Sequence, residues 1–391
     1  MEREASALLV ELGAIVLGLA VAARIGRRFG LSPIPLYLLA GMGIGEGGIH
    51  PIGAAEEFIE VGALLGVILL LLLLGIEYSA AQLLDGLRRS AHVVVGDFVL
   101  NFGPGLAAGA LLGWQVRAAL LLGGITYISS SGIIAKLLAD LGRVGNRETP
   151  AVLTVLVTED LVMAAYLPLM AALLVGEGAA GTLAAVATAL GAAVAVFAVA
   201  FRFGDHVSRM VFSRSSEVML LTLVGVTLLV AGLAERLQLS AAVGAFLVGI
   251  ALSGDVASQA RFLLLPLRNL FAAVFFVFFG LRVDPGLIPD VAVQAAALAV
   301  VTAATKIVIG WWAAGRDGVG VRGRVRAGTA LVARGEFSIV LATIGAGIEP
   351  DLGALAAAYV LFLAVAGPVL TRFADPLGAV LVRRTDRPTP S

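Results

Sequence analysis

The sequence has 391 residues, of which 60% are hydrophobic and 14% charged, with a formal net charge of zero and no Cys. Ordinary soluble domains carry about 25% charged residues, so this composition predicts a polytopic helical membrane protein and excludes a soluble enzyme or a nucleic-acid-binding protein. Three scattered His residues, the lack of Cys and the lack of a glycine-rich phosphate loop leave no metal-binding or nucleotide-binding motif, so we expect no cofactor.

Thirteen apolar windows are long enough to cross the ~30 Å hydrocarbon core of a bilayer. They lie at about 5–23, 31–49, 61–79, 91–113, 117–139, 149–175, 180–203, 217–234, 238–254, 266–282, 288–315, 326–347 and 352–373. Arg residues gather in alternate connections, from Arg24, Arg27 and Arg28 to the tail residues Arg383 and Arg384. The positive-inside rule therefore predicts an N-terminus outside and a C-terminus inside the cytoplasmic membrane.

The order of the windows predicts two six-helix repeats, at about 5–175 and 217–373, joined by a linker helix at about 180–203. The linker is a single span, so the two repeats have opposite orientations. Inverted repeats are typical of secondary transporters, whose sites lie near the middle of the membrane. We therefore interpret residues 1–373 as one membrane transporter domain and 374–391 as a short cytoplasmic tail. We expect the Arg-rich end of this tail, with Arg383, Arg384 and Arg387, to be disordered beside the membrane lipids.

Two windows in equivalent positions of the repeats contain residues that disfavour a continuous helix. The fifth window holds a Gly-rich and Ser-rich segment at 123–132, and the twelfth holds Ala333-Arg334-Gly335-Glu336 followed by Ser338. Such segments are poor helix interiors by propensity. Both windows are predicted to be broken helices whose free backbone groups line a cavity.

Ionisable residues near the middle of other windows are the candidate site. Glu159 and Asp160 lie in the sixth window, Lys306 in the eleventh and Asp97 in the fourth. Each buried charge costs about 2.5–3.5 kcal/mol on insertion scales, so such residues are functional candidates. Lys306 needs a partner, and successive helical residues point about 100° apart. We assign Glu159 to Lys306, Asp160 to the crossing of the broken helices, and Asp97 to a supporting position.

The ordered set of motifs resembles the monovalent cation/proton antiporters, in particular the branch of the glutathione-gated potassium efflux antiporters and related bacterial sodium/proton antiporters. The motifs are Pro35-Leu-Tyr-Leu-Leu-Ala-Gly41, Leu74-Gly-Ile-Glu77, Ser129-Ser130-Ser131, Glu159-Asp160, Gly244-Ala-Phe-Leu-Val-Gly249, Phe275-Phe-Val-Phe-Phe-Gly280, Lys306 and Gly335-Glu336-Phe337. The resemblance implies a homodimer with a dimerisation panel and a core of two crossing broken helices. It also implies that Asp160 carries both the cation and the proton, and that any gating domain is a separate cytoplasmic chain.

Competition at one carboxylate explains the exchange that this family performs, because a proton removes the charge that attracts the cation. A dehydrated monovalent cation needs several oxygen ligands, and the candidates are Asp160, Glu159, Thr126, Ser129 and Ser130. The supporting residues are Ser131 and Asp97, with Arg334 and Glu336 beside the second break, where they neutralise helix ends.

Three alternatives remain open at this point. A sodium-coupled symporter of a small organic anion, or a cation channel, can share such a fold. The ligand types suit Na+ and K+ equally. If cation binding withdraws Glu159 from Lys306, the lysine releases a proton and exchange is electrogenic, which we favour; if the pair stays intact, exchange is electroneutral.

Overall fold

The computed structural model describes residues 2–28, 32–45, 56–76, 91–175, 208–237, 240–252, 254–346 and 348–385, with a few further positions between 181 and 198. Every regular element in these ranges is a helix, which confirms the all-helical class. Nine helical stretches in the described ranges are long and apolar enough to cross a bilayer. The total of thirteen and the repeat boundaries stay predictions. Most of the linker helix at 180–203, Glu77 and the tail after Thr385 lie outside the described residues.

The chain folds into two compact units that each take segments from both halves of the sequence. Unit 1 comprises Met1–Arg24, Leu36–Leu84 and Asp160–Asp284, and unit 2 comprises Ile25–Pro35, Asp85–Glu159 and Pro285–Ser391. The division falls inside helix α8 (Thr149–Val175), between Glu159 and Asp160. The two adjacent acids that the sequence singles out therefore lie where the chain passes from one unit to the other.

Unit 1 is held together by close helix packing through small residues. Its helices are α1 (Glu2–Arg28), α2 (Ile34–Ile44), α3 (Glu56–Ile76), α10 (Ser216–Arg236), α11 (Ala241–Ala251) and α12 (Gly254–Leu281). Helix α3 packs against both α11 and α12. At the α3–α11 contact, a Cβ on Gly75 or on Gly249 would meet the backbone of the other helix, so only glycine permits this approach.

Two helices of unit 1 are shorter than the sequence predicts. Helices α2 and α11 each have 11 residues, where the windows 31–49 and 238–254 were predicted to span the bilayer. A spanning helix needs about 20 residues, so the described helix covers only part of the predicted span in each window. They occupy equivalent places in the two predicted repeats, which is consistent with the repeat prediction.

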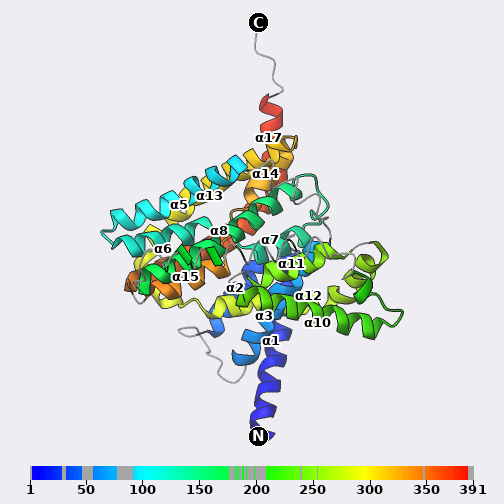
Figure 1. The fold of residues 1–391 in the computed structure, drawn as a ribbon. Coiled ribbons are helices and arrows are strands. Elements are labelled where there is room, and N and C mark those ends of the chain that lie inside the picture. The colour runs from blue at the N-terminus through cyan, green and yellow to red at the C-terminus, as the bar shows by residue number, and fades with distance from the viewer. Residues whose placement is uncertain are drawn as a thin grey trace. The chain divides into compact units, whose positions relative to one another are not determined.

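Unit 2 contains both predicted broken helices. Its elements are α5 (Ala91–Leu111), α6 (Val116–Tyr127), α7 (Ser131–Asp140), the first part of α8, the 3-10 turn Pro285–Leu287, α13 (Ile288–Arg316), α14 (Val321–Ala330), α15 (Glu336–Ala346), α16 (Pro350–Arg372) and α17 (Ala374–Thr385). Helix α5 packs along α6 and α13, and α13 packs along α14 and α16 (Figure 1). The interruption between α6 and α7 and the interruption between α14 and α15 confirm the two predicted breaks.

The first part of the predicted tail, residues Ala374–Thr385, forms helix α17. The helix packs against α14. Asp375, in its first turn, forms ion pairs with Arg143 and Arg326 at 2.8 and 3.0 Å. A negative charge in the first turn also favours the helix N-terminus. The basic residues that suggested disorder therefore lie at the end of a helix that is anchored at its start.

Candidate functional site

The two breaks bring the non-helical backbone between α6 and α7 and the backbone between α14 and α15 into contact within unit 2. Ile128 and Ser130 have extended backbone angles, and the Ser130 hydroxyl caps α7 by accepting a hydrogen bond from the Ile133 N–H at 3.2 Å. The Ser130 N–H donates across to the Ala333 carbonyl at 2.9 Å. A Cβ on Gly335 would lie 2.6 Å from the Ser130 Cβ, so the crossing requires glycine there. Each break thus supplies a hydrogen-bond partner for a backbone group that the other break leaves outside a helix.

Arg334 neutralises the carbonyl ends of two helices at this crossing. Its fully buried guanidinium donates two hydrogen bonds to the Thr126 carbonyl, at 3.2 and 3.0 Å, and one each to the Leu331 and Val332 carbonyls at 3.1 Å. These carbonyls belong to the C-terminal ends of α6 and α14, where helix dipoles concentrate negative charge. These contacts place Arg334 beside the second break, where the sequence predicted it. Glu336 begins α15, but its side chain lies outside the described ones.

Lys306 lies between two carboxylates in the interior of unit 2. Its ammonium is 2.5 Å from Glu159 Oε1 and 2.6 Å from Asp97 Oδ1. All three side chains are at most 2% exposed. The predicted Glu159–Lys306 pair is confirmed. Asp97, expected only in a supporting position, is a second direct partner of the lysine.

Each carboxylate is oriented by further donors. Glu159 accepts hydrogen bonds from the Ser129 N–H at 2.6 Å and from the Ser129 hydroxyl at 3.1 Å, so the first break holds it. Asp97 accepts from the Asn101 amide at 2.8 Å, and the Asn101 amide oxygen accepts from the Thr305 hydroxyl at 2.7 Å. The two acids that share Lys306 are thus fixed by different parts of the unit.

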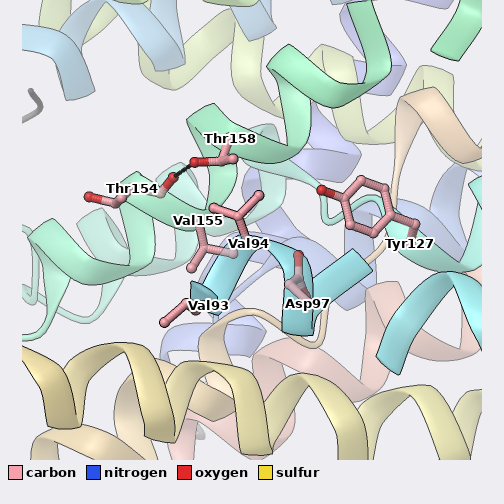
Figure 2. A pocket seen from close by; sticks show the side chains of 7 residues that line it. All are labelled: Val93, Val94, Asp97, Tyr127, Thr154, Val155 and Thr158. Atoms are coloured by element: carbon pink, nitrogen blue, oxygen red, sulfur yellow. Dashed lines mark hydrogen bonds between the residues drawn. The ribbon is translucent and has the colours of Figure 1, made fainter. Parts of the chain in front are cut away.

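A small cavity lies beside Asp97. It has a volume of about 10 Å³ and is lined by Val93, Val94, Asp97, Tyr127, Thr154, Val155 and Thr158. Figure 2 shows the Asp97 carboxyl and the Tyr127 ring at this cavity, with the Thr158 hydroxyl donating to the Thr154 carbonyl. A volume of about 10–15 Å³ is near the minimum for one water molecule. The Tyr127 ring also faces Lys306, whose ammonium is 5.4 Å from the ring centroid.

The predicted cation ligands of unit 2 gather at the first break. The Thr126 hydroxyl donates to the Asn101 carbonyl at 2.7 Å, and the Ser129 hydroxyl lies 3.1 Å from both Glu159 and the Leu331 carbonyl. Ser131 Oγ is buried with no hydrogen-bond partner among the described residues. These hydroxyls keep lone pairs that can accept from a donor or approach a cation.

The chain matches a known transporter family over almost its full length. A family model described as "Sodium/hydrogen exchanger, transmembrane" covers residues 14–375. The chain belongs to this family. This membership confirms the cation/proton antiport and the multi-pass membrane location that the sequence motifs implied.

Relatives of the exchanger support the same conclusion. It is 31% identical to the "K(+)/H(+) antiporter subunit KhtU" of Bacillus subtilis and 30% identical to the "Ammonium/H(+) antiporter subunit AmhT" of Alkalihalophilus pseudofirmus, with 93% of each chain covered in both comparisons. The solved sodium proton antiporter MjNhaP1 of Methanocaldococcus jannaschii shares the fold. It matches 98% of this chain and 100% of its own with a TM-score of 0.71 at 16% identity.

Three residues of the exchanger's buried network were not predicted from the sequence. Asn101, Thr305 and Tyr127 hold or face the charged groups. The contact of Asn101 with Asp97 could have been predicted, because Asn101 follows Asp97 by four residues and residues at this spacing lie on the same face of a helix. Thr305 adjoins Lys306, yet its contact with Asn101 depends on the packing of α5 against α13 and has no local signal.

Proposed function

We propose that this chain is a secondary antiporter that exchanges Na+ or K+ for protons, with Asp160 as the carboxylate that alternately holds either ion. The observation that carries the proposal is the commitment of Glu159 to Lys306 and Ser129. Asp160 follows on the same helix and points about 100° away, so it cannot share these partners. Glu159 is thus held at the first break, and the resemblance to the cation/proton antiporters assigns ion binding to its neighbour Asp160.

Exchange follows from competition at this carboxylate. A protonated Asp160 carries no charge and binds a cation poorly, whereas an ionised Asp160 attracts one. The remaining oxygens for the cation come from Glu159 and from the hydroxyls and carbonyls of Thr126, Ser129 and Ser130. Arg334 and Ser131 shape the crossing that presents these oxygens. Because each ion excludes the other, the gradient of one drives the movement of the other.

The names of the relatives support a monovalent cation as substrate, since they include a K+/H+ antiporter subunit and an ammonium/H+ antiporter subunit. A "Probable Na(+)/H(+) antiporter" of Bacillus cereus is 25% identical over 86% of this chain. We propose a homodimer in the cytoplasmic membrane with the N-terminus outside and the C-terminus inside. A separate cytoplasmic regulatory subunit belongs to the same proposal, consistent with the word "subunit" in two of these names.

The test uses purified protein in liposomes that contain a pH-sensitive dye. Adding Na+ or K+ outside should drive protons out of the acidified lumen. Asp160→Asn should reduce this flux at least about tenfold, because ionic attraction to a partly buried carboxylate is worth more than about 1.4 kcal/mol. The matched control is Asp351→Asn, an exposed acid at the start of α16, which should keep wild-type flux.

Three outcomes contradict the proposal. Cation-driven proton flux above about a tenth of wild type in Asp160→Asn, in a correctly assembled protein, would show that another group carries the ions. Cation flux without any proton flux in the wild type would point to a channel. An absolute requirement for an organic anion would point instead to the symporter reading.

A further inference from the structure

Among the described side chains near the helix crossing of unit 2, the charged groups that are at most 2% exposed sum to zero. Lys306 and Arg334 are the two cations, and Asp97 and Glu159 are the two anions; each is at most 2% exposed. If Glu159 were the single counter-ion of Lys306, a bound cation would draw Glu159 away and the lysine would release a proton, which favours electrogenic exchange. The structure gives Lys306 two counter-ions.

We propose that Asp97 is a fixed counter-ion that keeps Lys306 protonated throughout the transport cycle, so that one proton exchanges for one monovalent cation and no net charge crosses the membrane. This proposal rests on the proposed function, because it concerns the stoichiometry of exchange at Asp160. Asp97 is a positioning residue in this scheme: it acts through Lys306 and does not touch the transported ions.

The contact between Asp97 and Lys306 is built into the packing of α5 against α13. The Asp97 carboxylate accepts from Asn101, and Asn101 accepts from Thr305, the residue next to Lys306. The same helices approach closely at Gly96, where a Cβ would lie 2.6 Å from the Trp312 ring. One side-chain contact between the helices and one glycine approach therefore set the register of α5 against α13, and Asp97 lies 2.6 Å from Lys306 in that register.

Glu159 is held differently. Its donors other than Lys306 are the N–H and hydroxyl of Ser129, in the first break, and it adjoins Asp160. A cation bound at Asp160 attracts the Glu159 carboxylate as well. If Glu159 then moves away from Lys306, it still accepts hydrogen bonds from the N–H and hydroxyl of Ser129. Lys306 then still has Asp97 at 2.6 Å and the face of Tyr127 at 5.4 Å.

Electroneutral exchange follows from these contacts. The groups that face the Lys306 ammonium are Asp97 from α5, Glu159 from α8 and the Tyr127 ring from α6. With Asp97 in place, withdrawal of Glu159 does not leave a buried ammonium without a counter-ion, so the condition for release of its proton is not met. The proton released when a cation binds comes from Asp160 alone.

The test is the cation gradient at which net flux stops, measured in liposomes at zero potential and at −100 mV. A thiocyanate gradient sets the potential, so that K+ remains free to serve as a test ion. For one-for-one exchange, this null gradient equals the proton gradient at either potential. For two protons per cation, one net charge moves, and 100 mV shifts the null gradient about fifty-fold. Because it is an equilibrium quantity, slower transport by a damaged protein does not move it.

We expect the wild-type null gradient to change less than about twofold with potential, for whichever of Na+, K+ or ammonium is exchanged. In Asp97→Asn, Lys306 depends on Glu159 alone, and we expect the null gradient to become potential-dependent. In Glu159→Gln the Asp97–Lys306 pair remains. Exchange should therefore be slower, but its null gradient should still be independent of the membrane potential.

A wild-type shift approaching fifty-fold overturns the proposal, and this measurement decides even if Asp97→Asn does not assemble. A potential-independent null gradient in an assembled Asp97→Asn protein overturns it too, because Lys306 would then be held without Asp97. Failure of the proposed function looks different, since wild-type protein would show no cation-driven proton flux and no null gradient to measure.

Discussion

Unit 2 contains two clusters with the same formal charges in different surroundings. The core cluster, at the helix crossing, consists of Asp97, Glu159, Lys306 and Arg334. The edge cluster, at the ends of α7, α8, α14 and α17, consists of Arg143, Glu148, Arg326 and Asp375. Each has two acids and two cations. In the edge cluster Arg143 and Glu148 are buried, but the Asp375 side chain is 49% exposed and Arg326 25%, whereas no core member exceeds 2%.

The identity of the cations separates the clusters further. Burial lowers the pKa of Arg143; burial also opposes the charge of Arg326, but hydrogen bonds and attraction to Glu148 and Asp375 raise the pKa of that residue. Arginine keeps its proton in either case. The edge cluster is therefore a permanent brace between α14, α17 and the segment before α8. The core cluster contains a lysine, which loses its proton when buried without a counter-ion, so its partners decide its charge.

The largest difference should appear when one cation is removed from each cluster. Lys306→Met leaves two buried carboxylates around an apolar side chain, and breaking a buried charge pair costs about 3–5 kcal/mol. Arg326→Met leaves Glu148 with the Asn146 amide at 3.0 Å and Asp375 with Arg143, so we expect about 1–2 kcal/mol. Apparent melting temperatures of the purified variants in detergent should fall in this order. Equal losses would show that burial does not distinguish the clusters.

A second change in the core should restore part of that loss. Replacing a buried ion pair by neutral groups costs far less than removing one partner. Asp97→Asn added to Lys306→Met should therefore recover about 1–3 kcal/mol, which is the usual size of coupling between contacting residues. The double-mutant cycle on melting temperature measures this recovery. The control is Asp351→Asn added to Lys306→Met; recovery of the same size there would rule out a specific Asp97–Lys306 interaction.

The helix breaks and the Lys306–Glu159 pair could be predicted because each depends on a local rule. The Gly-rich and Ser-rich segment at 123–132 and the segment around Arg334 are poor helix interiors, and a lone lysine at membrane depth needs an acid. The assignment of Glu159, not Asp160, used only the 100° step of a helix. These features do not depend on how separate helices pack.

The role of Asp97 could not be predicted because it depends on the register of α5 against α13. That register is set by contacts such as Asn101–Thr305 and the approach of Gly96 to Trp312, between residues about 200 positions apart. Helix α17 was missed for a related reason. Its sequence ends in basic residues and prolines, and its stability comes from ion pairs between Asp375 and residues of other segments.

The smallest expected effect concerns salt. Asp375 bridges Arg143 at 2.8 Å and Arg326 at 3.0 Å, but its half-exposed carboxylate is screened by ions in solution. Asp375→Asn should therefore lower stability by about 0.3–1 kcal/mol at low salt, and the difference from wild type should shrink towards zero near 1 M salt, where the Debye length is about 3 Å. The destabilisation by Lys306→Met should remain at the same salt concentration, because ions do not reach a cluster that is buried from solvent. Melting temperatures of both variants and of wild type across a NaCl series, repeated with choline chloride to separate screening from Na+ binding, give the comparison. If the Asp375→Asn deficit persists at high salt, the edge brace acts through packing of α17 and not through charge.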